Sequence, residues 1–479
     1  MRKTGLLIPI ASLPSSFGIG DFGPTSYEFV DMLQECGCKM WQILPLNPLG
    51  FGNSPYQSLS SKAMDELYIS LELLKEKGLI EHLENYHASA DKIDYEGVRQ
   101  FKAVYLREAF SHFEENEEYK TFIQQPWVYE FAVFVAMKKA NHEKCWNEWP
   151  SDMKNWIHKK TPLNEVLQRE VNYQMFLQYV LYEQWMQLRN YANEKGIEMI
   201  GDLPIYVGID SLDVWANQKS FLLDDDGHPT FIAGVPPDYF SAEGQRWGNP
   251  LYDWDQLEKE DFAFWLDRLS YNAQLFDVVR IDHFRAFDTY WKIPASSPTA
   301  MVGEWIEAPG YKLFDTIYAT YPDIVIVAED LGDLRPEVLE LRDHYHMMGM
   351  RIVQHSFDPV HEMDEHENRL AYTGTHDNET LRVWYSHHPE SYKRKIRAFF
   401  KRNGYVYPRM SENMIQYTLE SKARWAIIPM VDLLNKTDKC RINFPGTVGY
   451  PNWQWKLKDY KEFEARIPLF KEMIKKANR

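Results

Sequence analysis

The sequence predicts a (β/α)8 barrel of the TIM type, with inserted helical and loop subdomains. Eight short apolar runs are spaced along the chain, and most segments between them carry the 3.6-residue periodicity of helices. The runs are continuously apolar rather than alternating, as expected of parallel strands that are covered on both faces. Three runs are followed within two residues by a carboxylate, where barrel enzymes carry catalytic residues.

The eight predicted strands follow one another from the first residues to near the end of the chain. They span residues 5–11, 40–46, 198–207, 277–281, 324–328, 350–355, 370–375 and 427–433. A helix over residues 171–196 leads into the third strand, with Gly196 as its C-terminal stop. An amphipathic helix after Trp453 is predicted to complete the barrel wall. We therefore predict a single catalytic barrel over residues 1–479.

Two stretches are longer than a barrel connection requires. Residues 62–170, between strands two and three, are rich in Glu, Lys, Trp and Tyr, and predict an inserted helical subdomain. Residues 210–255 form a second insertion, in which an Asp-Asp-Asp-Gly turn predicts a β-hairpin between residues 221–223 and 230–232. The aromatic residues over 235–250 predict a loop that caps a cleft.

Composition argues against several classes of function. Fifty-three Lys and Arg against 70 Asp and Glu leave a net charge of −17, which disfavours a nucleic-acid partner. No apolar run approaches the roughly 20 residues of a membrane span, so no membrane association is expected. Four cysteines in 479 residues are too few for a disulfide framework, which predicts reduced thiols and a cytoplasmic location. The oligomeric state stays unknown.

One motif has the spacing of a dinucleotide-binding site but lacks its context. Residues 18–23 match the spacing G-x-G-x-x-G, but Pro14 and two serines separate them from the first strand. The second strand also ends without an acid for a ribose. We predict that these glycines shape a loop at the rim of a cleft and bind no dinucleotide.

Asp282, Glu329 and Asp377 follow strands four, five and seven and should share the carboxyl face of the barrel. Three acids with neighbouring histidines fit either a divalent metal site or acid–base and nucleophilic chemistry. The alternative is that Arg280 and Asp282 form an ion pair with a purely structural role. Because no His-Glu-x-x-His motif occurs and buried like charges need an offsetting group, glycoside chemistry fits best, without a metal or cofactor.

Each acid suits a different role in that chemistry. Arg280 and Asp282 alternate with apolar residues, so both face one way and Arg280 is predicted to keep Asp282 ionised as a nucleophile. Glu329 has no adjacent cation, which suits a proton donor with a raised pKa. Asp377, with His376, is predicted to hold sugar hydroxyls and to favour an oxocarbenium-like ring.

Seven motifs resemble those of the 4-α-glucanotransferases of the amylomaltase (disproportionating enzyme) family, which is related to the α-amylase clan. Each is moderately specific, and the set in this order is highly specific. The motifs are Ser54-Pro55-Tyr56-Gln57, Gly201-Asp202-Leu203-Pro204-Ile205-Tyr206-Val207, Gly244-Gln245 with Trp247-Gly248-Asn249-Pro250, Arg280-Ile281-Asp282-His283-Phe284-Arg285, Ala328-Glu329-Asp330-Leu331-Gly332, Gly374-Thr375-His376-Asp377-Asn378, and Arg441-Ile442-Asn443 before Pro445-Gly446-Thr447.

The resemblance implies transfer of an α-1,4-glucan segment to the 4-hydroxyl of another glucan or glucose, by a retaining double displacement through a covalent glycosyl-enzyme. It implies Asp282 as nucleophile, Glu329 as general acid/base and Asp377 as transition-state stabiliser. The implied sugar-binding residues are Arg280, His283 and His376 at the donor sugar, and Ser54, Tyr56, Asp202, Gln245, Trp247 and Asn443 along the glucan.

The implied partners are malto-oligosaccharides and starch or glycogen-type glucans, and no cofactor or metal is implied. Two alternatives remain open. An α-1,4-glucan hydrolase would use the same three acids, because only the fate of the glycosyl-enzyme differs. A non-catalytic, glucan-binding regulatory barrel is the less favoured alternative, because all three acids are present.

Overall fold

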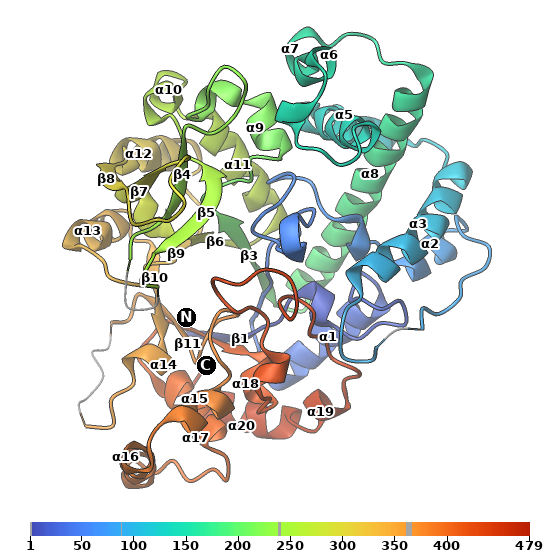
Figure 1. Ribbon diagram of the computed structural model, residues 1–479. Coiled ribbons are helices and arrows are strands. Elements are labelled where there is room, and N and C mark those ends of the chain that lie inside the picture. Colours follow the sequence, from blue (N-terminus) through green and yellow to red (C-terminus); the bar gives the residue numbers. More distant parts are fainter. Residues whose placement is uncertain (1, 88, 238–240, 361–365) are drawn as a thin grey trace.

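A closed barrel of eight parallel strands forms the centre of the molecule (Figure 1). The computed structural model describes residues 2–87, 89–237, 241–360 and 366–479. Around the barrel the strand order is β1-β12-β11-β10-β9-β6-β3-β2. The strands are β1 (Lys3–Leu7), β2 (Met40–Gln42), β3 (Glu198–Pro204), β6 (Val278–Asp282), β9 (Ile326–Ala328), β10 (Met348–Ile352), β11 (Arg369–Tyr372) and β12 (Trp425–Pro429). The predicted fold class is confirmed.

All eight predicted strands occur, but most end earlier than predicted. The last residues assigned to the sixth and eighth strands instead form the short helices α14 (Val353–Ser356) and α18 (Met430–Leu433). Likewise, a 3₁₀ turn at Ile10–Ser12 follows β1. Except for His355, these residues stay buried in the turns at the carboxyl end of the barrel, so the apolar character continues beyond the strands.

The strand register brings the predicted acids to one end of the barrel. β3 and β6 pair Asp202 with Arg280, and β6 and β9 pair Ile281 with Ala328. Asp282 and Glu329, the next residues of β6 and of the chain after β9, therefore lie side by side. The backbone N–H of Glu329 also donates to the Ile281 carbonyl at 3.0 Å.

Helices cover the outside of the barrel. They are α1 (Pro24–Cys36), α8 (Glu165–Glu194), α9 (Leu212–Ala216), α10 (Trp254–Lys259), α11 (Ala263–Leu275), α12 (Gly310–Thr320), α13 (Pro336–His344), α15 (Leu381–His387), α16 (Glu390–Arg402), α17 (Met410–Glu420), α19 (Lys461–Glu464) and α20 (Ile467–Lys476). The predicted helix before the third strand is α8, which begins earlier because Asn164 caps its N-terminus. The predicted C-terminal helix is divided into α19 and α20, and a proline stands in the first turn of α20.

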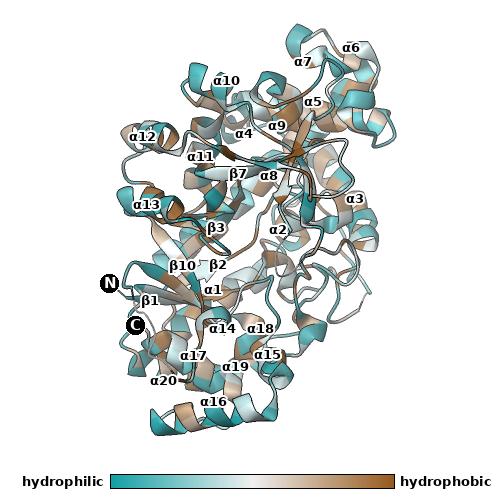
Figure 2. Ribbon diagram, turned by 60° about the vertical axis from the view of Figure 1, so that its left-hand side comes forward, coloured by the Kyte–Doolittle hydropathy of each residue, from teal (hydrophilic) through white to brown (hydrophobic). Residues whose placement is uncertain are grey.

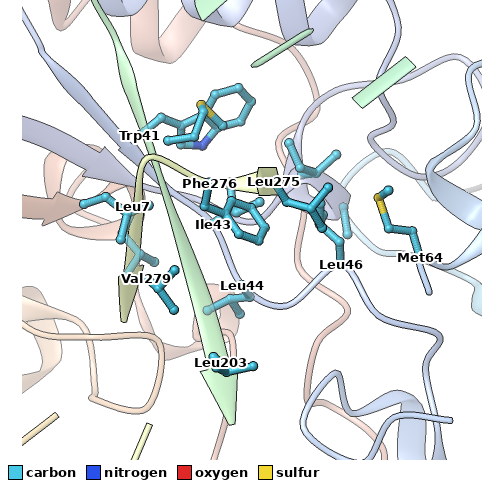
Figure 3. Close-up of a cluster of buried hydrophobic side chains, with 14 of the residues drawn as sticks. Leu7, Trp41, Ile43, Leu44, Leu46, Met64, Leu203, Leu275, Phe276 and Val279 are labelled. Atoms are coloured by element: carbon cyan, nitrogen blue, oxygen red, sulfur yellow. The ribbon is translucent and has the colours of Figure 1, made fainter. Parts of the chain in front are cut away.

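Apolar side chains from neighbouring strands meet between the barrel and its helices. Figure 3 shows Leu7, Trp41, Leu203 and Val279 of β1, β2, β3 and β6 with Phe276 at the end of α11. Residue 201 of β3 must be glycine here, because a Cβ atom would lie 2.3 Å from the Phe276 ring. Figure 2 shows that outer helices such as α16 carry hydrophilic residues along much of their length.

The stretch between β2 and α8 is helical. Its helices are α2 (Leu71–Glu76), α3 (Tyr95–His112), α4 (Glu117–Phe122), α5 (Pro126–Ala140), α6 (Ser151–Lys154) and α7 (Trp156–Lys159). Its tryptophans Trp146, Trp149 and Trp156 are buried.

The predicted place of the glycine motif of residues 18–23, in a loop at the rim of a cleft, stays a prediction. Gly18 is buried, with Tyr86 and Val98 of this stretch next to its α-carbon. The division of the chain into a barrel with a helical subdomain over 62–170 stays a prediction.

A separate four-stranded antiparallel sheet has the order β5-β4-β7-β8. Its strands are β4 (Phe231–Val235), β5 (Gln245–Pro250), β7 (Thr289–Pro294) and β8 (Glu304–Glu307). Two predictions about residues 210–255 are wrong in detail. Residues 245–250 form a strand rather than a loop, and the predicted hairpin is reduced to one bridge, Leu223 with Pro229, because Phe231 and Ile232 pair with other strands. Residues 238–240 of the predicted capping loop lie outside the described residues.

Three further observations concern the chain as a whole. All four cysteines are unpaired, with Cys36 and Cys38 buried. Among the described residues, no group of three or more His, Cys, Asp or Glu side chains is arranged to hold a metal ion. Within the same residues, no helix combines the length and the apolar character that crossing a membrane requires.

Candidate active site

Arg280 lies at the centre of the predicted site and binds two carboxylates. Its Nη1 donates to Asp202 Oδ1 at 2.6 Å, and its Nη2 donates to Asp282 Oδ1 at 3.0 Å. Arg280 and Asp202 are buried, whereas the Asp282 side chain is 30% exposed. The alternation of β6 places Arg280 and Asp282 on one side, as predicted.

The pKa of Asp282 is raised to about 6. Burial is the largest cause, and the negative charges of Asp202 and Asp377 add to it, whereas Arg280 and His376 act in the opposite direction. We expected Arg280 to hold the pKa of Asp282 low, but the pKa is raised. Arg280 shares its charge with Asp202, and the effect of burial outweighs the effect of Arg280. The carboxyl group is nevertheless ionised at pH 7.

Glu329 follows β9 and has the stronger shift. Burial and the charge of Asp282 raise the pKa of Glu329 well above its ordinary value. The backbone N–H of His283 donates to Glu329 Oε2 at 2.7 Å, from a left-handed residue with φ of 56°. Burial thus raises the pKa of both neighbouring carboxyl groups, and the pKa of Glu329 is raised well above its ordinary value, as a proton donor requires.

Asp377 is held by a segment from the far end of the chain. Asn443 Nδ2 donates to Asp377 Oδ1 at 2.6 Å, and Arg441 donates to the backbone carbonyl of Asp377. The Asn443 N–H also donates to the His376 carbonyl at 3.1 Å. Asp377 lies in a turn that Asn378 closes by accepting the Thr375 N–H at 2.7 Å. Its side chain is 41% exposed, so it is open to a ligand.

Tyr56 links the two sides of the site. Its hydroxyl donates to Asp202 Oδ2 at 2.7 Å and lies 3.0 Å from His376 Nε2. The Tyr56 and His376 rings are stacked, with 5.4 Å between their centroids. His376 Nε2 in turn lies 3.3 Å from Asp377 Oδ1. Burial and the charge of Asp202 raise the pKa of Tyr56 well above its ordinary value, so its hydroxyl stays a donor.

The remaining predicted residues are placed differently. The Trp247 ring stands edge-on to His283 at 4.8 Å, and Trp247 Nε1 donates to Gln245 Oε1 at 3.2 Å. Burial and the charge of Arg285 lower the pKa of His283 to about 3, so its ring is neutral. Ser54 Oγ accepts the Tyr56 N–H at 3.3 Å, so this side chain shapes the turn that carries Tyr56 and contacts none of the three acids.

Two neighbours of the site were not predicted. The Trp453 ring lies 5.8 Å from Tyr56 and 6.1 Å from His376, between centroids. The Gln57 side chain donates to Asn249 Oδ1 at 3.1 Å. Gln57 belongs to the motif Ser54-Pro55-Tyr56-Gln57, but the sequence predicts no binding role for it. The only sequence signal for Trp453 is that it is an aromatic residue in a turn close to Asn443.

The barrel and the two carboxyl groups of different pKa at its carboxyl end are those of an enzyme that acts on glycosidic bonds. A family model described as 4-alpha-glucanotransferase, glycoside hydrolase family 77, matches residues 8–462. The chain belongs to this 4-alpha-glucanotransferase family and has its enzymatic activity. The resemblance stated from the motifs is thereby confirmed.

Relatives match over nearly the whole chain. The 4-alpha-glucanotransferase of Aquifex aeolicus is 39% identical over 482 residues, covering 98% of each chain. That of Thermus thermophilus is 40% identical over 475 residues, covering 95% of each chain. Among solved structures, the amylomaltase of Streptococcus agalactiae in complex with acarbose matches with a TM-score of 0.94 and 36% identity, over the full length of both chains.

Proposed function

We propose that the enzyme disproportionates malto-oligosaccharides and the α-1,4-linked chains of starch or glycogen-type glucans, with Asp282, Glu329 and Asp377 as its catalytic acids. The observation that carries the assignment is the adjacent pair of Asp282 and Glu329 at two neighbouring strand ends, with Asp282 hydrogen-bonded to Arg280 and the pKa of Glu329 raised well above its ordinary value. The acarbose complex of the streptococcal amylomaltase supports binding of oligosaccharides at this fold.

In the first step, the Asp282 carboxylate attacks the anomeric carbon of the donor glucan. The glycosidic C–O bond breaks, and the proton of Glu329 passes to the departing 4-oxygen, which releases the reducing-end fragment. The charge of Arg280, 3.0 Å from Asp282, orients the nucleophile. The product is a covalent glycosyl-enzyme with the configuration inverted once.

In the second step, the 4-hydroxyl of an acceptor attacks the same carbon. Glu329, now a carboxylate, takes the hydroxyl proton, and the bond to Asp282 breaks, so the configuration is retained overall. Asp377 and His376 are proposed to bind the hydroxyls of the reacting sugar, because both present polar atoms beside Tyr56. Water in place of the acceptor would give hydrolysis.

Transfer requires that the glycosyl-enzyme be shielded from water. Trp247 is the residue that we propose for this role, because its partly buried ring packs on His283, next to both Asp282 and Glu329. We expect Trp247→Ala to raise the ratio of hydrolysis to transfer. An unchanged ratio, measured as free glucose against longer oligosaccharides, would remove Trp247 from this role.

Incubation of the protein with maltotriose separates the candidate functions. Glucose together with maltopentaose and longer chains is the expected result, whereas glucose and maltose alone would mean hydrolysis. Asp282→Asn tests the nucleophile and should abolish turnover while glucan binding is kept. Turnover that persisted in this variant would contradict the assignment, and binding without turnover in the unaltered chain would favour a regulatory barrel.

A further inference from the structure

A basic pocket lies among the C-terminal helices, and none of the three predicted acids lines it. Its volume is about 670 Å³, and its walls come from α15, from α19 and from the residues that precede α17, follow α18 and precede α20. These helices gather at the lower edge of the molecule in Figure 1. Four cationic side chains line the pocket, Arg382, Arg409, Lys436 and Arg466, with one carboxylate, Glu462.

The cationic side chains that line this pocket outnumber the carboxylates that pair with them. Lys436 pairs with Glu462, and Arg466 Nη1 pairs with Glu412 Oε1 at 3.0 Å. Arg409 shares that same Glu412 oxygen, at 3.8 Å. The Arg382 side chain forms no hydrogen bond or ion pair with any residue that the structure describes. Four cations therefore face two carboxylates, in a chain whose net charge is −17.

We propose that this pocket binds a phosphorylated sugar, as a site separate from the glucan-binding acids. A phosphate monoester carries up to two negative charges near pH 7, which matches the excess of two cations. Guanidinium groups bind phosphate oxygens through paired N–H donors, and Arg382 and Arg409 have donors to spare. The volume is that of a small-molecule site, and Glu462 offers acceptors to sugar hydroxyls.

The pocket is connected to the segment that carries Asp377. The Thr380 hydroxyl donates to the Lys436 carbonyl at 2.8 Å, and the Thr380 N–H donates to Asp438 Oδ1 at 3.1 Å. Thr380 follows Asp377 in the same turn region, and Arg441, which binds the Asp377 carbonyl, follows the pocket residue Cys440. A ligand that moves the Lys436 segment therefore acts on Asp377, so occupancy is expected to change kcat.

Calorimetric titration of the full chain tests the site. The probes are glucose 6-phosphate, inorganic phosphate and, as the uncharged comparison, glucose. We expect glucose 6-phosphate to bind with a dissociation constant of about 1 mM or below, more tightly than inorganic phosphate. Equal affinity for both probes would overturn the sugar part of the proposal, and no heat with either would overturn all of it.

Two charge-reversed variants locate the binding. Arg382→Glu should weaken binding of glucose 6-phosphate at least about tenfold, and because Arg382 has no partner, folding and transfer without ligand should be unchanged. Arg394→Glu, an exposed position on α16 outside the pocket, makes the same change of net charge and should leave affinity unaltered. Equal loss in both variants would overturn the site. Unchanged kcat at saturating glucose 6-phosphate would overturn the coupling to Asp377.

Discussion

Burial governs the chemistry of single residues in this site as much as neighbouring charge does. Asp282 lies within hydrogen-bonding distance of a guanidinium, yet its pKa is raised, because Arg280 is also bound by Asp202 and the carboxyl group is largely buried. Arg280 orients the Asp282 carboxylate, and burial determines how readily Asp282 takes up a proton.

The pH dependence of transfer follows from these shifts. Asp282 must be ionised, so kcat/KM is expected to fall about tenfold per pH unit below pH 6, where its carboxyl group becomes protonated. Glu329 must be protonated, and because its pKa is raised, we expect kcat/KM to fall only on the alkaline side of neutral pH. Initial rates on maltotriose between pH 4.5 and 9 check this. A constant kcat/KM down to pH 4.5 would contradict the shift of Asp282.

The raised pKa of Asp282 also costs stability. Its folded pKa of about 6 exceeds the unfolded value of 3.8, so the folded state holds the proton more tightly and the free energy of unfolding falls as pH rises from 4 to 6. Asp282→Asn removes this cost and should raise the free energy of unfolding by about 1–2 kcal/mol at pH 7. The gain should shrink toward pH 4 in denaturant melts, and a gain independent of pH would refute this reasoning.

At the scale of elements, Asp330, the residue after Glu329, fixes the chain at the end of β9. Asp330 is buried and accepts hydrogen bonds from Arg342 of α13, from Arg369 of β11 at 2.6 Å and from the Met350 N–H of β10 at 2.7 Å. Gly349 leaves the space for this cluster, because a Cβ atom there would lie 2.6 Å from Asp330 Oδ2. The segment that carries Glu329, the proposed acid/base, is thus positioned by three elements outside the site.

Asp330→Asn is expected to remove about 3 kcal/mol or more of stability, because the buried Arg342 and the partly buried Arg369 lose the charge that they share. It should also lower kcat more than it changes KM, since Glu329 is displaced. Asp343→Asn is the matched control, because Asp343 pairs with the same Arg342 but is 60% exposed, and it should cost under about 1 kcal/mol. Thermal melts and maltotriose kinetics check both variants, and equal losses would contradict the role of Asp330.

The elements that sequence could predict are those whose signal is local. The barrel strands are apolar runs, and Asp282, Glu329 and Asp377 are marked by standing just after them. The sequence predicts a loop where β5 forms, because Gly248 and Pro250 are turn formers and the strand depends on pairing with β4. Asp330 and Trp453 were missed for the same reason, since their partners come from α13, β11 and Tyr56, far away along the chain.

At the scale of the whole molecule, a buried ion pair ties the helical stretch to the barrel. Lys102 of α3 is fully buried, and its Nζ donates to Asp21 Oδ2 at 3.1 Å and to the carbonyls of Leu67 and Ile69. Burial outweighs the ammonium group and raises the pKa of Asp21. The pair joins the chain after β1 to the helices that follow β2.

Lys102→Met should cost about 3–5 kcal/mol, because it leaves the Asp21 charge buried without its partner. The double variant Lys102→Met, Asp21→Asn should lose less than the two single losses added together, since the pair is removed as a unit. Lys120→Met, at an exposed pair with Glu117, is the control and should change stability by under about 1 kcal/mol. Additive losses in chemical denaturation would argue against the pairing.

The pairing of β1 with β12 sets the order of events while the chain is being made. Lys3 to Leu7 find their partners on one side only in Trp425 to Pro429, so the seam of the barrel closes after most of the protein has left the ribosome. Until then β1 has an unpaired edge that another nascent chain can join. Asn443, which holds Asp377, emerges later still, so a chain halted before this point lacks the hydrogen bond that fixes the Asp377 carboxylate.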